Sequence, residues 1–238
     1  MSEIFSFETF GKVITDFSYL YKDGLIYTIA IALGSVFVGI IISLFITPLR
    51  MSNSKILRFI GSTYIEIIRS TPLIVQLYII FYGFSAILEP LYPKFELFGF
   101  IDSTRYLPCI LAVGLNSGAY ISEIIRAGIS AVDRGQTEAA RSLGMTKIQT
   151  MRFVIMPQAI KNILPSLGNE FVSVIKESSI CMFIGVKDIM FMANDVTTRL
   201  YAPMEPLIVA AILYFLLTFP TSKLIAYFER RMSRGDKR

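Results

Sequence analysis

The chain has 238 residues and a net charge of +5; 54% of its residues are hydrophobic and 17% are charged. Soluble domains carry about 25% charged residues, so this composition argues against disorder and against an ordinary soluble domain. The chain has no histidine, which excludes histidine-based catalysis and histidine metal sites. Cys109 and Cys181 both lie in apolar runs, and we expect neither a metal site nor a structural disulfide.

Long uncharged stretches predict an all-α membrane protein with five transmembrane helices. A soluble helical protein would instead show amphipathic stripes of period 3.6. The predicted fourth span is interrupted by Glu170, Lys176 and Glu177. The expected spans cover about residues 24–47, 70–88, 106–125, 164–186 and 206–226.

The distribution of basic residues predicts the orientation. With the N-terminus outside and the C-terminus in the cytoplasm, most of the 23 Lys and Arg residues fall on the inner side, while Lys94 is among the few outside. This arrangement satisfies the positive-inside rule. We therefore expect an external segment at 1–23, a transmembrane domain at 24–231 and a cytoplasmic tail at 232–238. The basic tail is interpreted as a membrane-side anchor, so no nucleic-acid partner is expected.

The polar stretch between the third and fourth spans, about residues 127–163, predicts two short cytoplasmic helices. Asp133 and Gln136 have the spacing of a capping box at the start of the first helix. Gly144 would end that helix in a left-handed conformation. Thr146 and Gln149 repeat the box spacing.

The second of these helices is expected to end near Pro157. Small alanines on the first helix would let a partner backbone approach closely, and Glu138 and Arg141 would supply rim ion pairs that fix the register. A hairpin that merely joins two spans is the alternative, and spacing alone does not separate the two interpretations.

The loop resembles the EAA loop of the membrane subunits of ABC importers. Glu138-Ala139-Ala140 is followed by three residues, Gly144, nine residues, and Val154-Ile155-Met156-Pro157. In that family the short helix is a coupling helix that sits in a cleft of the ATP-hydrolysing subunit. The resemblance implies a coupling role for Asp133, Gly135, Gln136, Glu138, Ala139, Ala140, Arg141, Leu143, Gly144 and Pro157.

More of the chain, from about Gly24 to Arg231, resembles the permeases for polar amino acids, the group that includes histidine, glutamine, arginine and opine permeases. The matching segments are Tyr64-Ile65-Glu66, Arg69-Ser70-Thr71-Pro72-Leu73, Gln76, Gly118-Ala119-Tyr120, Glu123, Arg126, Gly135-Gln136, Pro157-Gln158-Ala159 and Lys176-Glu177-Ser178-Ser179.

The resemblance implies a transport subunit in the bacterial cell membrane and not an enzyme. It implies four partners: a dimer of ABC ATPase subunits, a second permease chain that is identical or paralogous, an extracellular or periplasmic solute-binding protein, and an amino-acid substrate. No Gly-x-x-x-x-Gly-Lys-Ser/Thr loop occurs in the sequence. We therefore expect this chain to bind no cofactor, with ATP and Mg²⁺ used by the partner ATPase.

Polar residues inside the predicted spans are candidates for a substrate path. Asn116, Tyr120 and Glu123 fall on one helix face, and Asn169 and Glu170 lie in the fourth span. Glu123 would meet a cationic group of the substrate or, as the alternative, pair with Arg126 and hold the loop. Glu170 has the same ambiguity between a cavity ligand and a partner of loop residues.

Two other function classes compete with an ABC permease. A stand-alone secondary transporter of small polar solutes usually shows an inverted repeat, and none is visible. A membrane enzyme is disfavoured by the absence of histidine and of paired carboxylates with a plausible site.

Overall fold

The computed structural model describes residues 5–88, 96–97 and 101–233, and this part of the chain is almost entirely helical. The elements in chain order are α1 (Phe7–Asp16), α2 (Ser18–Arg50), α3 (Lys55–Ser70), α4 (Leu73–Leu88), β1 (Glu96–Leu97), β2 (Ile101–Asp102), α5 (Ser103–Ser130), α6 (Arg134–Ser142), α7 (Lys147–Gln149), the π-helical η1 (Thr150–Ile155), α8 (Met156–Glu177), the 3-10 helical η2 (Ser178–Ile184), α9 (Ile189–Leu200) and α10 (Met204–Ser233). The two strands form one short antiparallel pair.

Three helices of the described chain, α2, α5 and α10, are each long and apolar enough to cross a membrane. The helices α3 and α4 pass the same test only when they are taken together, as a fourth candidate. The chain bends by 107° between them. Thr71 and Pro72 lie at this bend. Helix α4 covers most of the predicted span at 70–88, and the bend separates it from the amphipathic helix α3, which lies in none of the predicted spans.

The predicted span at 164–186 is divided. Helix α8 ends at Glu177, and η2 continues the chain as a tighter helix. Two hydroxyl groups accompany the change, since Ser178 Oγ donates to the carbonyl of Ile175 at 2.8 Å and Ser179 Oγ to that of Lys176 at 2.7 Å. Such side-chain bonds compete with the helical backbone pattern. A count of five spans is not confirmed by helix length and composition.

The helices α2 and α5 share the most extensive contact among the described elements. A Cβ atom added at Gly114 would lie 2.7 Å from Val38, and one added at Gly118 would lie 2.9 Å from Ile42. Small residues let membrane helices approach closely and gain packing energy. This contact places α5 in the middle of the bundle, beside α2, α4 and α8.

The main core joins α5 to the region after α8, and it contains both cysteines, fully buried. Cys109 on α5 and Cys181 on η2 form a disulfide, with their Cα atoms 6.0 Å apart. The expectation of no structural disulfide is therefore wrong. The two residues are 72 positions apart, so only the packing of η2 against α5, which composition does not reveal, brings them together.

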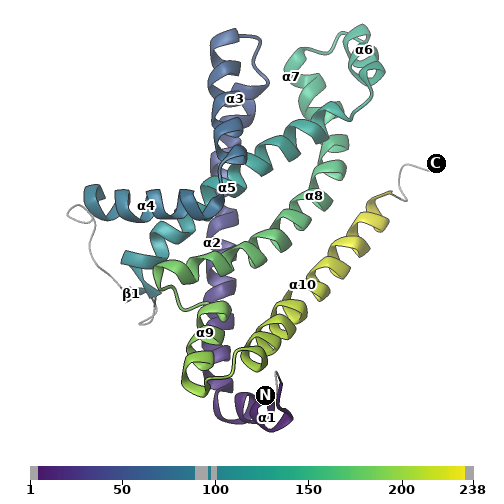
Figure 1. The fold of residues 1–238 in the computed structure, drawn as a ribbon. Helices are drawn as coiled ribbons and strands as arrows, with labels where there is room; N and C mark the ends of the chain where they lie inside the picture. The colour runs from purple at the N-terminus through teal and green to yellow at the C-terminus, as the bar shows by residue number, and fades with distance from the viewer. Residues whose placement is uncertain (1–4, 89–95, 98–100, 234–238) are drawn as a thin grey trace.

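The bundle has two distinct ends (Figure 1). The hairpin of α6 and α7 projects at one end, and α1 and α9 lie at the other, with α2 running between them. Helix α1 is tied to α10 because the backbone N–H of Ser6 donates to Glu205 at 2.7 Å. Lys94, residues 1–4 of the predicted external segment and residues 234–238 of the predicted tail lie outside the described residues.

Candidate functional site

The first candidate site is the projecting hairpin. Along α6, the side chains of Glu138, Ala139 and Arg141 are exposed, and Leu143 after the helix is 85% exposed. A single exposed leucine is ordinary on a protein surface, so this exposure shows only that the hairpin is accessible to a partner. The structure thus brings most of the predicted coupling residues onto one projecting element.

The start of α6 confirms one half of the predicted capping box. The side chain of Asp133 accepts from the backbone N–H of Gly135 at 2.7 Å, so Asp133 is the N-cap. The side chain of Gln136 does not return to the cap; its Oε1 accepts from Gln158 Nε2 at 3.3 Å. This bond connects α6 to α8. Gly144 has a positive φ of 84°, as predicted for the residue after the helix.

The second predicted box is confirmed, because Thr146 and Gln149 make both reciprocal hydrogen bonds. The predicted end near Pro157 is wrong. The chain stays helical through η1 and α8, and Pro157 lies in the first turn of α8. Proline supplies no backbone N–H to this continuous helical segment, and it lies directly after the π-helical η1, where the hydrogen-bond pattern already departs from that of an α-helix.

The two alanines of the hairpin differ in exposure. Ala139 is exposed, whereas Ala140 is only 4% exposed and helix α6 packs against η1. Neighbouring residues on a helix point about 100° apart, so the two cannot share one docking face. The expectation that Ala140 meets a partner backbone is corrected: Ala140 fastens α6 to its own chain, and Ala139 lies on the free surface.

The second candidate site is polar and lies inside the bundle. Ser117 Oγ on α5 donates to Glu170 Oε1 on α8 at 2.8 Å. Asn116 Nδ2 donates to Gln76 Oε1 on α4 at 3.3 Å. The two bonds involve adjoining residues of α5: Asn116 bonds to α4, and Ser117 bonds to Glu170 on α8. Asn169, the other predicted path residue of α8, is exposed.

Gln76 is a site residue that reasoning from spacing did not single out. It is 7% exposed, and its Nε2 donates to the carbonyl oxygens of Ile68 at 2.7 Å and Thr71 at 3.0 Å. These acceptors lie at the bend between α3 and α4, where Pro72 supplies no N–H. Gln76 therefore holds the bend and orients Asn116. A lone glutamine in an uncharged run was the available signal.

Glu123 is fixed by two arginines and not left free. Arg126 Nη2 approaches Glu123 Oε2 at 2.8 Å, and Arg50 Nε at the end of α2 approaches Oε1 at 3.4 Å. Arg50 also donates to Ser62 on α3 at 2.7 Å. The structure therefore matches the alternative in which Glu123 is a structural ion pair, here one that joins α5 to α2.

Tyr120 and Glu123 line a cavity of about 490 Å³ between α5 and α8, but the buried Asn116 does not. The guanidinium group of Arg69 lies 5.0 Å from the centre of the Tyr120 ring, a cation–π distance. Asn162 and Ser166 of α8 complete the polar wall. The predicted face of Asn116, Tyr120 and Glu123 is thus divided between this cavity and the bonds to Gln76.

Long apolar helices, polar groups between them and a projecting polar hairpin define the class: a multi-pass permease of the membrane. Residues 35–234 match the family described as binding-protein-dependent transport system inner membrane component. The chain belongs to this family.

Individual relatives cover nearly the whole chain. A putative glutamine transport system permease protein, GlnP, of Rickettsia bellii is 36% identical over 91% of this chain and 98% of its own length. The arginine transport system permease protein ArtQ of Bacillus subtilis is 35% identical over 90% of this chain and 93% of its own. A crystal structure of an amino acid ABC transporter with histidines matches with a TM-score of 0.81 and 44% identity, over 92% of this chain and 96% of that one.

Proposed function

We propose that this chain is the permease subunit of an ATP-driven importer for polar amino acids. The observation that carries the proposal is the combination of an exposed hairpin, α6–α7, with a polar path along α5 and α8, the two helices that the hairpin connects in the chain. The relatives named for glutamine and arginine transport support the substrate class.

In the proposed topology the N-terminus is outside and the hairpin and C-terminus are in the cytoplasm. Five spans then comprise α2, the bent pair α3–α4, α5, α8 with η2, and α10. The proposed partners are a dimer of ABC ATPases, a second permease chain and an external solute-binding protein. The ATPase hydrolyses ATP, and this chain converts its closure into alternating access.

The proposed roles follow the geometry. Glu138, Ala139, Arg141 and Leu143 contact the ATPase, because they are exposed on the hairpin. Glu170 and Asn169 line the substrate path on α8, and Tyr120 lines it on α5. Asn116 acts through its bond to Gln76, and Glu123 holds α5 to α2.

The test is uptake by vesicles that contain the chain together with its ATPase and binding protein. We expect accumulation of radiolabelled L-glutamine or L-arginine that needs internal ATP and stops when the ATPase carries an inactivating substitution. Uptake of the same magnitude by vesicles with this chain alone would contradict the proposal and favour a stand-alone secondary transporter.

A further inference from the structure

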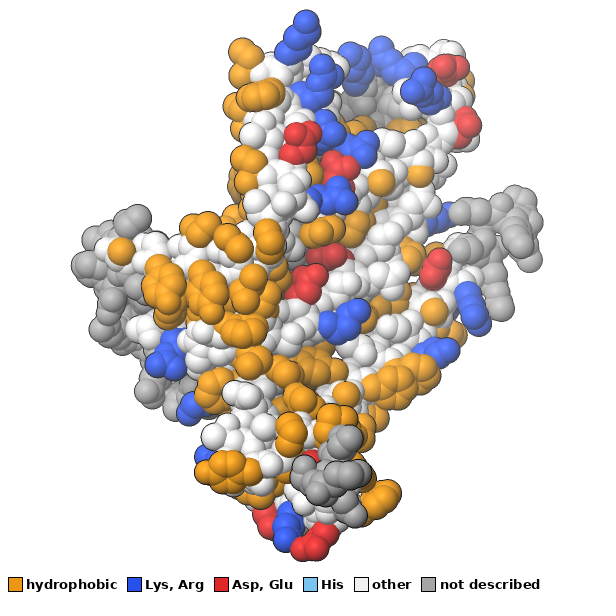
Figure 2. Space-filling model, in the orientation of Figure 1, with side chains coloured by type: hydrophobic (Ala, Val, Ile, Leu, Met, Phe, Trp, Pro, Cys, Tyr) orange, Lys and Arg blue, Asp and Glu red, His pale blue; other side chains and the backbone are white. Residues whose placement is uncertain are grey.

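Helix α1 has one apolar face and one charged face. Four apolar side chains at helical spacing share the first face: Phe10, Val13, Ile14 and Phe17. The opposite face carries Glu8 and Lys12, which form an exposed ion pair at 2.7 Å. Figure 2 shows charged side chains gathered at the end of the molecule that α1 forms, with apolar side chains beyond them on α10. This pattern is typical of a helix that lies in the boundary between membrane and water.

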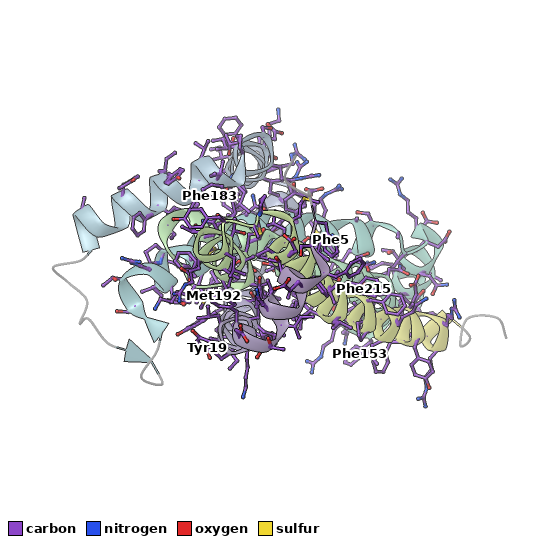
Figure 3. The ribbon with its side chains drawn as sticks, turned by 60° about the horizontal axis from the view of Figure 1, so that its bottom comes forward. Phe5, Tyr19, Phe153, Phe183, Met192 and Phe215 are labelled. Atoms are coloured by element: carbon purple, nitrogen blue, oxygen red, sulfur yellow. A yellow bond between two sulfur atoms is a disulfide. The ribbon has the colours of Figure 1, made fainter. Side chains whose placement is uncertain are left out.

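Helix α1 is fastened to both of its neighbours. Its N-cap, Ser6, donates its backbone N–H to Glu205 at the start of α10. The hydroxyl group of Tyr21 on α2 donates to the carbonyl oxygen of Pro206 at 3.0 Å. Val13 is fully buried in the core that the three helices share with α9. In Figure 3, which brings this end of the bundle forward, α1 lies against α2 and the first part of α10.

The frame of α1, α2 and α10 encloses an apolar groove of about 410 Å³, a volume in the range of ligand pockets. Its apolar wall consists of Phe10, Val13 and Ile14 of α1, Tyr21 and Leu25 of α2, and Val209, Ile212 and Leu213 of α10. Ile14 is 50% exposed and Ile212 is 45% exposed, so the groove is open to the surroundings of the protein. The exposed side chains of Phe215, labelled in Figure 3, and Leu216 continue the apolar surface along α10.

The groove has a single charged residue in its wall, Lys22. Lys22 is exposed, and it forms no ion pair with another residue of the described ranges 5–88, 96–97 and 101–233. The neighbouring Asp23 points about 100° away on the helix and does not line the groove. Ser18 is the other polar residue of the wall. The groove therefore combines a long apolar wall with one available cation.

The charge pattern places this cation at the level of lipid headgroups. On α2, residues 24–49 follow Asp23 without a charge, and on α10, residues 206–222 follow Glu205 without a charge. Uncharged stretches of this kind occupy the hydrocarbon core of a membrane. Lys22 lies just outside the first stretch, whereas Leu25 and Ile212 lie inside the two stretches. The cation is thus at headgroup depth, and the apolar wall is at the depth of acyl chains.

We propose that this groove binds one membrane phospholipid, with an acyl chain along the apolar wall and the phosphate group on Lys22 Nζ. In the proposed topology the lipid belongs to the outer leaflet. Burial of the chain contributes free energy in proportion to its apolar area, and the lysine attracts the anionic headgroup. The bound lipid fills the space between α2 and α10 beneath α1. This site is independent of which amino acid is transported, so it goes beyond the proposed function.

The experiment measures lipid binding to the complete permease–ATPase complex in a neutral detergent. The permease has no tryptophan, so Phe10→Trp adds a single fluorescent reporter to the groove wall, and the complex without this substitution supplies the background of the ATPase. The two probes are brominated phosphatidylglycerol and brominated diacylglycerol, which has the same acyl chains but no phosphate. Bromine quenches tryptophan on contact. We expect quenching by phosphatidylglycerol that saturates at one lipid per permease chain.

Variants in the reporter background separate the two parts of the site. Lys22→Met should raise the half-saturating concentration of phosphatidylglycerol about 5-fold, the value of one basic side chain near an anionic lipid, and leave that of diacylglycerol unchanged. Lys22→Arg should retain the affinity. Ile212→Phe should weaken binding of both lipids, because the larger ring occupies the groove.

Lys12→Met is the matched control, because it removes the same charge from the opposite face of α1 and Lys12 does not line the groove. It should leave the binding of both lipids unchanged, and size-exclusion chromatography checks that each complex is intact. Quenching that does not saturate, or that Lys22→Met leaves unchanged, would overturn the site and indicate ordinary lipid contact. Absence of quenching by either lipid would overturn it in favour of a contact between two permease chains. Neither result bears on amino-acid uptake, which tests the proposed function separately.

Discussion

The paired alanines of the hairpin allow a sharp test of coupling. Ala139 and Ala140 are adjacent on α6, but Ala139 is exposed and Ala140 is 4% exposed. Enlarging each to tyrosine adds the same side chain to the same helix in two different environments. The expected consequences therefore differ in kind, and the pair serves as its own control.

Ala139→Tyr should leave the hairpin folded, because exposed substitutions usually change stability by less than 0.5 kcal/mol. If the ATPase approaches α6 closely, the added ring must be accommodated at the subunit contact. Overpacking costs roughly 1–3 kcal/mol, which corresponds to a loss of about 5- to 150-fold in affinity at 1.4 kcal/mol per decade. Ala140→Tyr should cost a similar free energy inside the permease, where α6 packs against η1.

Two measurements separate these outcomes: titration of the ATPase onto the permease in detergent, and limited proteolysis of the hairpin. Ala139→Tyr should lose ATPase affinity with an unchanged cleavage pattern. Ala140→Tyr should increase cleavage around residues 131–146 and lose affinity as a consequence. Normal ATPase affinity in Ala139→Tyr would refute the placement of Ala139 at the contact.

Three further predictions use the same reasoning. Gly144→Val should lose ATPase association in a pull-down assay, because a left-handed backbone costs about 1–2 kcal/mol for a residue with a Cβ. The space around Gly144 is open, so a steric clash of the new side chain does not explain the loss. Gly144→Asn should lose less association than Gly144→Val, and equal losses would contradict a backbone origin. Glu123→Gln should lower the thermal unfolding temperature by a few degrees, since it weakens pairs with Arg126 and Arg50 worth about 1 kcal/mol; an unchanged temperature would exclude this clamp. With cysteine reporters, Lys12→Cys should react with an impermeant reagent in intact cells and Arg134→Cys only after permeabilisation, and external labelling of both would contradict the proposed topology.

Features that depend on a few consecutive residues could be predicted from the sequence. The reciprocal bonds of Thr146 and Gln149 and the positive φ of Gly144 are confirmed, because caps and helix stops are set by neighbours in the chain. Asp133 is also the expected N-cap. Its predicted partner Gln136 bonds instead to Gln158, 22 positions away, so a tertiary contact replaced the local one.

Features that depend on packing could not be predicted in the same way. The disulfide of Cys109 with Cys181 and the burial of Ala140 both require two elements to be placed in space first. The 107° bend is a related case. The proline at the bend was visible in the sequence, but the role of Gln76, which bonds carbonyl groups on the far side of the bend, depends on the folded arrangement of α3 and α4.

Helix α8 illustrates a different limit. A search for apolar runs averages over all faces of a helix, so the polar residues of α8 weaken the signal for a span and the helix is not among the three that are long and apolar enough. At helical spacing, the same residues, among them Asn162, Ser166 and Asn169, form a polar stripe along one face of α8. A membrane span that has one face on a polar path must carry such a stripe. Composition and periodicity therefore point in opposite directions here, and periodicity is the more informative.

Helix α7 of the hairpin and helix α8 belong to one continuous helical segment, and this continuity gives the proposed coupling a physical route. From α7 the chain runs without a break through η1 into α8. Helix α6 is attached to this segment by the burial of Ala140 and by the bond from Gln158 to Gln136. In the proposed function, a displacement of α6 by the ATPase would therefore displace the base of α8. Because Glu170 on α8 bonds to Ser117 on α5, the same displacement would change the relation of the two helices that line the proposed substrate path, as alternating access requires.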